Sequence, residues 1–214
     1  MLTLAQQTYV PDDNFEQELI NQGYDTVLDD SVTTANIDTA TILFANNLNI
    51  ADLTGIEDFI ALTWLSCFSN QLDSLDVSFN TALTHLFCQG NQLTSLDVSN
   101  NTALYTLNCD DNLLTSLDVR NGNNDNFTVF DAVPNPNLTC ISVDDALWST
   151  TNWIDIDSQH YFSTNCSITD IEEHSINKEL LKVTDILGRE TKQTNQPLFY
   201  IYDDGTIEKR IKIE

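Results

Sequence analysis

Apolar residues in the middle of the chain recur with a period of 21 residues. Three segments, beginning at Leu62, Leu83 and Leu104, align without a gap under the consensus LxxLxCxxNxLxxLDVxxN. At the LxC position the alternation of inward and outward residues is typical of a short β-strand. The second half of each repeat has a similar spacing of leucine and valine. We therefore expect the return path to be extended as well, and the repeats to contain little helix.

The pattern is that of a leucine-rich repeat, in which each repeat forms one coil of a stack. Two weaker copies flank the three clear ones, at residues 40–61 and 127–143, so we expect about five coils within residues 40–145. An asparagine follows each LxC strand at a fixed offset, where its side chain can hydrogen-bond the backbone of neighbouring coils. The expected asparagine ladder consists of Asn70, Asn91 and Asn112.

The residues before the repeats have a helical pattern that suits a cap on the open end of the stack. Asp13 is the expected N-cap, Glu16 would complete a capping box three residues later, and Gly23 would end the helix. The apolar face of this helix would consist of Phe15, Leu19 and Ile20. We therefore assign residues 6–39 to an N-terminal cap.

The chain is strongly acidic, since 33 Asp and Glu residues against 8 Lys and Arg give a formal net charge of −25. Phosphate backbones and anionic lipid headgroups are recognised through clusters of Lys and Arg, so the charge argues against nucleic acid and membrane-surface binding. No apolar run is long enough to span a bilayer, and we expect no membrane insertion. Only one basic residue, Arg120, precedes residue 178, which indicates a boundary between residues 177 and 178.

No residue pattern in the chain indicates an enzyme or a bound cofactor. The sequence has three histidines, lacks the G-x-S-x-G motif of many hydrolases, and has no glycine-rich phosphate loop. Three cysteines spaced 21 residues apart should point inward on neighbouring strands, but zinc sites need four ligands, commonly from paired CxxC spacings. We expect Cys67, Cys88 and Cys109 to be free thiols that fill the core.

The repeat consensus over residues 40–145 resembles the leucine-rich repeats of secreted and surface proteins from the Bacteroidetes group. Residues 6–39 look like the N-terminal caps of those proteins and, less closely, like the helical cap of internalins. Residues 1–5 resemble the end of an export signal and are interpreted as its remnant. The resemblance implies a secreted or surface-attached protein with a mainly β fold, a leucine-rich-repeat solenoid of about five coils.

The tail, residues 178–214, resembles a shortened type A C-terminal sorting domain of the type IX secretion system. The likeness rests on residues 183–190, 199–205 and 209–213, whereas the Pro-Asn-Pro opening of the longer form is absent. The resemblance implies transport across the outer membrane by the type IX machinery. Three short strands are expected in this small β tail, at Leu180–Thr184, Leu198–Tyr202 and Thr206–Ile213.

Cys140 and Cys166 bracket a segment rich in aromatic residues that follows the repeats. In an exported protein a disulfide between them would close a C-terminal cap, which we place at residues 146–177. The odd total of five cysteines fits one such bridge and three free thiols.

The outward positions of the first strand in each repeat are the candidate partner-binding residues. They stack into one surface that is aromatic toward the N-terminal side and polar toward the C-terminal side. They are Trp64, Ser66, Phe68, His85, Phe87, Gln89, Thr106, Asn108 and Asp110. We expect a non-catalytic module for recognition or adhesion, which binds a protein or polysaccharide partner at the bacterial cell surface.

An alternative is an acidic structural protein of the cell envelope that binds divalent cations and has no specific partner. Asp76, Asp97 and Asp118 recur at one repeat position and should form a ladder of like charges. At the spacing of neighbouring strands, such charges repel by about 1 kcal/mol per pair even in water. Solvent, salt and nearby serine hydroxyls could relieve this repulsion, or a cation such as Ca²⁺ could bridge the carboxylates.

Overall fold

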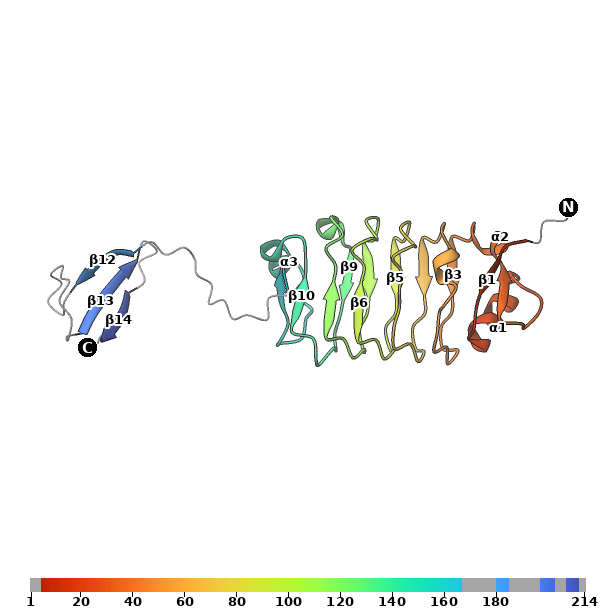
Figure 1. The fold of residues 1–214 in the computed structure, drawn as a ribbon, viewed down its shortest axis with the longest axis horizontal. Helices are drawn as coiled ribbons and strands as arrows, with labels where there is room; N and C mark the ends of the chain where they lie inside the picture. The colour runs from red at the N-terminus through yellow and green to blue at the C-terminus, as the bar shows by residue number, and fades with distance from the viewer. Residues whose placement is uncertain (1–4, 167–179, 185–196, 203–206, 212–214) are drawn as a thin grey trace. The chain divides into compact units, whose positions relative to one another are not determined.

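The structure, a computed structural model, describes residues 5–166, 180–184, 197–202 and 207–211 (Figure 1). It divides into two units, Met1–Ser167 and Ile168–Glu214. The first unit contains the repeats together with the residues that flank them on both sides, and the second contains the tail. The domain boundaries assigned from the sequence, including the one between residues 177 and 178, stay predictions.

Five successive segments of the first unit each contribute one strand to a parallel sheet. In chain order the strands are β3 (Ile42–Phe44), β4 (Trp64–Ser66), β5 (His85–Phe87), β7 (Thr106–Asn108) and β9 (Val129–Asp131). Their register places equivalent residues of the repeats opposite one another, with Leu65 opposite Leu86 and Leu86 opposite Leu107. One repeat of the sequence therefore corresponds to one strand position in the sheet. Two short 3-10 helices, η1 (Ile56–Asp58) and η2 (Asn124–Asn126), occupy turns between strands.

A second parallel sheet forms on the return path of the coils. In the order of pairing it contains β6 (Ser95–Asp97), β8 (Ser116–Asp118), β10 (Cys140–Ser142) and β11 (Tyr161–Ser163). The expected extended return path is thus present from residue 95 onward. The preceding coil departs from the expectation, because residues 74–76 have the same Ser-Leu-Asp sequence as β6 but form no strand. This leaves β6 at the edge of the sheet.

An antiparallel pair of strands and two helices precede the coils. They are β1 (Gln7–Tyr9), α1 (Asp13–Asn21), β2 (Ser31–Thr33) and α2 (Thr34–Ile37). The prediction of Asp13 as N-cap is wrong by one residue, because the carboxylate of Asp12 accepts hydrogen bonds from the N–H groups of Asn14 and Phe15. Its other oxygen accepts from the N–H groups of residues 51 and 52. Asp12 therefore caps the helix and also joins it to the first coil.

Glu16 does not complete a capping box, which corrects the second expectation for this helix. With Asp12 as N-cap, Glu16 lies one position beyond the capping-box site, and its side chain is fully buried. Its carboxylate accepts hydrogen bonds from the N–H groups of residues 29–31 and so holds the segment that leads into β2. Gly23, with a φ of 84°, follows the end of the helix as predicted.

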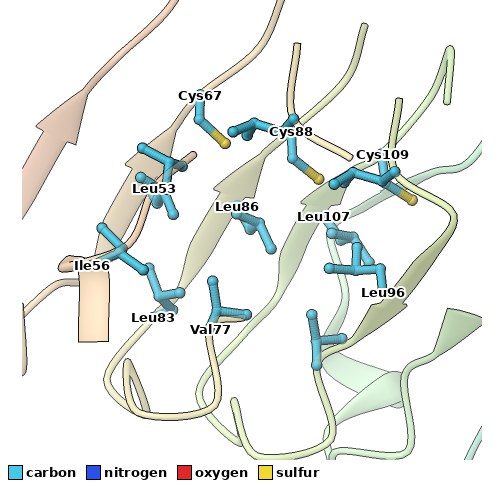
Figure 2. Packing of buried hydrophobic residues seen from close by; sticks show 14 of the residues in the cluster. Leu53, Ile56, Cys67, Val77, Leu83, Leu86, Cys88, Leu96, Leu107 and Cys109 are labelled. Carbon is cyan, nitrogen blue, oxygen red and sulfur yellow. The ribbon is translucent and has the colours of Figure 1, made fainter. Parts of the chain in front are cut away.

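One continuous core runs through the first unit. It is built mainly from the leucines of the coils, with Cys67, Cys88 and Cys109 on neighbouring coils among them (Figure 2). All three thiols are free and fully buried, which confirms their predicted role in the core. Burial raises the pKa of the Cys67 thiol to about 12, and raises the pKa of the other two well above the ordinary value.

We expect the three core thiols to be unreactive in the folded protein, because only the thiolate reacts and burial suppresses both ionisation and access. At mildly alkaline pH, a chromogenic thiol reagent should label none of them until a denaturant unfolds the chain. Unfolding without a reductant should then release three thiols per chain, since the other two cysteines are bonded to each other. Rapid labelling of the folded chain would contradict this expectation.

Asparagine side chains pair the backbone between coils, as the repeat predicts. The Nδ2 group of Asn91 donates to the carbonyl oxygens of Cys67 at 3.1 Å and Cys88 at 3.0 Å, and its Oδ1 accepts from the N–H group of Leu72 at 3.1 Å. Equivalent contacts are made by Asn70, Asn112 and Asn135. A second ladder, not predicted from the sequence, consists of Asn80, Asn101 and Asn121.

A disulfide and an aromatic cluster close the last coil. Cys140 and Cys166 are bonded, with their Cα atoms 5.7 Å apart, which confirms the predicted bridge. Between them lies α3 (Ala146–Asn152), which is followed by the buried Trp153. The Trp153 ring stacks on Phe130 of β9 at a centroid distance of 4.1 Å, so it covers the end of the core.

The second unit is a three-stranded antiparallel sheet. Its order is β12 (Leu180–Thr184), β13 (Pro197–Tyr202) and β14 (Ile207–Ile211), which agrees with the three expected strands apart from their ends. Residues 185–190, 203–205 and 212–213, on which the likeness to a sorting domain partly rests, lie outside the described residues, as do residues 1–4.

Candidate partner-binding face

Two rows of side chains form the outward face of the five-stranded sheet. Alternate residues of a strand point to opposite sides, so the first and third residues of each strand lie outward. The first row is Ile42, Trp64, His85, Thr106 and Val129. The second row is Phe44, Ser66, Phe87, Asn108 and Asp131. We call these two rows, with the outward residues two positions after the second row (Phe68, Gln89 and Asp110), the sheet face.

Three predicted aromatic residues of the sheet face lie against one another. The ring of Trp64 stacks on His85 at a centroid distance of 4.1 Å and contacts Phe87 at 5.2 Å. Tyr105 packs its edge against His85 at 4.7 Å. Burial lowers the pKa of His85, which favours the neutral imidazole in this stack. The rings therefore form one contiguous aromatic surface, as the repeat spacing predicts for Trp64, His85 and Phe87; Phe68, also expected in it, makes no ring contact with them.

Two apolar residues of the sheet face were not among the predicted site residues. Ile42 is 46% exposed and Phe44 is 51% exposed, and the register places them beside Trp64 and Ser66. Both come from the weak first copy of the repeat, whose outward positions follow the same alternation as the clear copies. That alternation was the signal that could have identified them.

Several of the predicted residues expose little surface on the sheet face. Ser66 and Thr106 are only 4% and 5% exposed, because each small side chain lies between larger neighbours. The hydroxyl of Ser66 donates to Oδ1 of Asn46 at 2.7 Å. Phe68 and Asn108 are half-buried, and Oδ1 of Asn108 accepts from the N–H group two residues later.

Three buried polar atoms of the sheet face lack a hydrogen-bond partner in the part of the chain that the structure describes. Nε1 of Trp64, Oε1 of Gln89 and Oδ1 of Asp110 are buried, and none makes a hydrogen bond to the described residues. Burial and the neighbouring carboxylate of Asp131 raise the pKa of Asp110. Buried polar groups without a hydrogen bond are costly, so a bound partner that satisfied these atoms would gain affinity.

Comparison with known proteins identifies the class of this fold. No family model matches the sequence. A stretch of 73 residues is 38% identical to internalin J of Listeria monocytogenes serotype 4b (strain F2365) and covers 34% of this chain and 8% of that protein. The functional domain of InlJ from Listeria monocytogenes, a structure that includes a cysteine ladder, is 32% identical with a TM-score of 0.51, over 67% of this chain and 39% of that chain. The chain is a leucine-rich-repeat protein.

A second solved structure agrees with this fold. The internalin InlF of Listeria monocytogenes str. 4b F2365 has a TM-score of 0.50 at 22% identity, over 63% of this leucine-rich-repeat protein and 39% of that chain. The chain thus spans well under half the length of each of these three relatives. None of the helices in the described part of the chain is long and apolar enough to cross a membrane.

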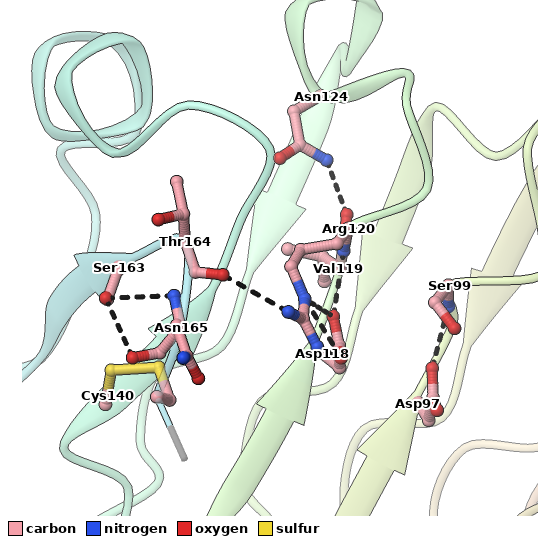
Figure 3. A network of polar contacts seen from close by, with 11 residues as sticks. Asp97, Ser99, Asp118, Val119, Arg120, Asn124, Cys140, Ser163, Thr164 and Asn165 are labelled. Carbon is pink, nitrogen blue, oxygen red and sulfur yellow. Dashed lines mark hydrogen bonds and ion pairs between the residues drawn. A yellow bond between two sulfur atoms is a disulfide. The ribbon is translucent and has the colours of Figure 1, made fainter. Parts of the chain in front are cut away.

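The return path of the leucine-rich-repeat protein carries two of the three aspartates of the predicted ladder on paired strands, whereas Asp76 lies in a segment that forms no strand. Asp97 and Asp118 are paired across β6 and β8, and Oδ1 of Asp97 accepts a hydrogen bond from the N–H group of Ser99 (Figure 3). Oδ1 of Asp76 accepts one from the N–H group of Ser78. The hydroxyl and N–H group of Ser78 lower the pKa of Asp76 despite its partial burial. Local hydrogen bonds therefore stabilise these two carboxylates.

Asp118 has a cationic partner, Arg120, the single basic residue among the first 177. Burial opposes ionisation of Asp118, but hydrogen bonds from Arg120 and its charge outweigh that effect and lower the pKa of the carboxyl. Nε of Arg120 lies 2.9 Å from Oδ1 of Asp118, and Nη1 donates to the carbonyl oxygen of Thr164 at 3.2 Å (Figure 3). Arg120 thus joins β8 to the segment just before Cys166.

Potential metal ligands gather elsewhere in the described residues. Two overlapping groups, in which the carboxylate oxygens lie within 4.8 Å of one another, surround Glu16 in the N-terminal cap. Their other members are Asp13 and Asp30 in one group and Asp25 and Asp29 in the other. The aspartate ladder forms no such group within the described part of the chain. Cation binding at Asp76, Asp97 and Asp118 stays a prediction.

Proposed function

We propose that this leucine-rich-repeat protein is a non-catalytic recognition or adhesion module that binds a protein or polysaccharide partner through the sheet face. The observation that carries the proposal is the aromatic stack of Trp64, His85 and Phe87 beside buried polar atoms that lack a partner. Aromatic side chains at the centre of a surface are typical binding hot spots. The homology to internalin J supports a module of this kind.

Rigid display is the proposed mechanism. The strands of the sheet face are backed by a continuous core, so little conformational entropy is lost when a partner docks. The aromatic rings supply apolar contact area. Nε1 of Trp64 is a donor for a partner's oxygen, and the free oxygens of Gln89 and Asp110 accept from hydroxyl or amide groups.

We also propose that the protein is exported and then secreted or attached to the cell surface, by the type IX route of Bacteroidetes. In this proposal the coils form a solenoid capped at both ends, residues 1–5 are the remnant of an export signal, and residues 178–214 are read by the secretion machinery. The Cys140–Cys166 disulfide supports export, because such bonds persist in oxidising compartments. The short antiparallel sheet of the tail is compatible with a sorting domain.

The proposed binding is tested on an array of glycans and extracellular proteins with the full chain. We expect a ligand whose affinity falls by about 100-fold in the Trp64→Ala/Phe87→Ala double variant, because each residue has the size and position of a hot spot. Affinity would be measured by calorimetry, and folding of the variant by circular dichroism.

The matched control is the Leu147→Ala/Ile154→Ala double variant. These two side chains are 79% and 84% exposed, and they lie in the C-terminal cap, outside the sheet face. Their removal deletes exposed apolar surface without touching the aromatic stack, so affinity should stay unchanged. Binding that survives the loss of Trp64 and Phe87 would argue against the sheet face as the site.

The acidic groups around Glu16 favour the second candidate, a structural protein that binds divalent cations. Glu16 is fully buried among other carboxylates, and hard cations such as Ca²⁺ take oxygen ligands of this type. A large rise of the melting temperature in millimolar Ca²⁺, together with an array that yields no ligand, would favour this candidate over recognition.

A further inference from the structure

A trough of about 790 Å³ lies on the return side of the first coils, apart from the sheet face. Three successive coils line it, through residues 52–57, 74–79 and 95–100. Leu53 and Ile56 at the lining are 4% and 3% exposed. Phe79, by contrast, is 65% exposed, although the neighbouring coils direct most of their apolar side chains inward. The trough thus combines an open entrance with apolar contact surface.

The trough borders an unpaired strand edge. β6 is the last strand of the return-side sheet, and no backbone hydrogen bond among the described residues joins it to residues 74–76. Leu75 is only partly buried, whereas its equivalents Leu96 and Leu117 are 2% and 1% exposed. The coil of residues 72–80 lies against that side of β6, since the N–H group of Gln92 donates to the carbonyl oxygen of Leu72 and Nδ2 of Asn101 to that of Val77. No backbone hydrogen bond is made by residues 74–76 themselves to the described residues, and backbone groups without partners can bind an extended chain.

The walls of the trough are acidic. Four carboxylates line it, those of Asp52, Glu57, Asp76 and Asp97, and no basic residue does so. Each accepts a hydrogen bond from a nearby backbone N–H group, which fixes its position without neutralising its charge. A cationic ligand would therefore meet an ordered set of charges of opposite sign.

We propose that this trough binds an extended polypeptide segment in which basic and apolar side chains alternate. The segment's backbone runs along residues 74–76, its lysine or arginine side chains pair with the carboxylates, and its apolar side chains cover Phe79 and Leu75. An alternating sequence fits this arrangement because successive side chains of an extended chain point to opposite sides. The basic side chains can then face the carboxylates while the apolar ones face Phe79 and Leu75. This site is separate from the sheet face, so it adds a second interaction surface to the protein.

The probe is a fluorescent heptapeptide of alternating lysine and leucine, titrated into the full chain and followed by anisotropy. We expect the Asp76→Asn/Asp97→Asn variant to bind it about tenfold more weakly, since two charges at the site are lost. Asparagine keeps the acceptor oxygen that each local hydrogen bond uses, so the coil should stay intact. The Phe79→Ser variant should also bind more weakly.

The control has the same change in net charge at residues that do not line the trough. The Asp111→Asn/Asp155→Asn variant replaces two exposed carboxylates outside the trough lining and should leave affinity nearly unchanged. Equal weakening by both pairs would overturn the proposal, because it would show a general attraction to a chain of charge −25. The Trp64→Ala/Phe87→Ala variant should bind the peptide normally, and weaker binding there would assign the peptide to the sheet face instead.

Two further results would overturn the proposal. One is the absence of any measurable binding by the wild-type chain. The other is release of the peptide by millimolar Ca²⁺ at constant ionic strength, together with Ca²⁺ uptake that the Asp76→Asn/Asp97→Asn variant lacks. That pair of observations would assign the trough to a divalent cation.

Discussion

Replacing Asn91 with alanine is expected to lower the free energy of unfolding by about 3–5 kcal/mol. The side chain satisfies three backbone groups, the carbonyls of Cys67 and Cys88 and the N–H group of Leu72. The surrounding core is closed to water, and each buried group left without a partner costs about 1–3 kcal/mol. Partial relaxation of the coil reduces the sum. Chemical denaturation with circular dichroism measures the loss.

Gln92 supplies the matched control for this prediction. It is the next residue in the chain and its side chain is exposed, so Gln92→Ala should change the free energy of unfolding by less than about 0.5 kcal/mol. A similar small effect for both variants would mean that the backbone groups beside Asn91 find water or other partners. The asparagine ladder would then contribute little to stability.

Loss of the Cys140–Cys166 disulfide is expected to destabilise the protein by about 3–4 kcal/mol. The bridge joins residues 26 positions apart, and the chain-entropy model gives this magnitude for a loop of that length. The Cys140→Ser/Cys166→Ser variant, or the wild type with a reductant, should therefore melt at a lower temperature. Tryptophan fluorescence should report the change, because Trp153 lies inside the closed loop and packs on Phe130.

The Cys140→Ser/Cys166→Ser variant is also the control for the effect of the reductant on the melting temperature. Once Cys140 and Cys166 are serines, the three remaining cysteines are free and buried, so added reductant should have no further effect. A reductant that lowers the melting temperature of the variant as much as that of the wild type would contradict the assignment of stability to this bond.

The repeats could be predicted from the sequence because their constraint is local and periodic. Leucine at fixed positions, a cysteine two residues after the strand leucine and an asparagine three residues later each have one place in a coil. The core thiols and the first asparagine ladder follow from that spacing alone. The N-cap was missed by one residue because two aspartates are adjacent, and the choice of Asp12 depends on a second contact to residues 51 and 52.

The unpaired residues 74–76 show where local sequence stops being informative. Their Ser-Leu-Asp sequence is identical to β6 and β8, so no local preference distinguishes them. The difference lies in the neighbouring coil, where η1 occupies the return path and offers no extended strand to continue the sheet. Strand formation therefore depends on the surrounding segments as well as on local sequence.

The candidate site was predictable in outline only. Alternation along the strand placed Trp64, His85 and Phe87 on one surface, and the structure brings their rings into contact. Which side chains stay exposed depends on the size of their neighbours, so the burial of Ser66 and Thr106 could not be read from the pattern.

Each asparagine of the first ladder bonds backward, to its own coil and to the coil before it. A complete inserted coil therefore supplies the asparagine that hydrogen-bonds the backbone of the coil before it. The backbone groups that this ladder satisfies then keep their partners. Insertions of other lengths break that pairing. Duplication or loss of a complete 21-residue segment is thus the tolerated evolutionary step. It would lengthen or shorten the sheet face by one strand while the packing of the remaining coils stayed as it was.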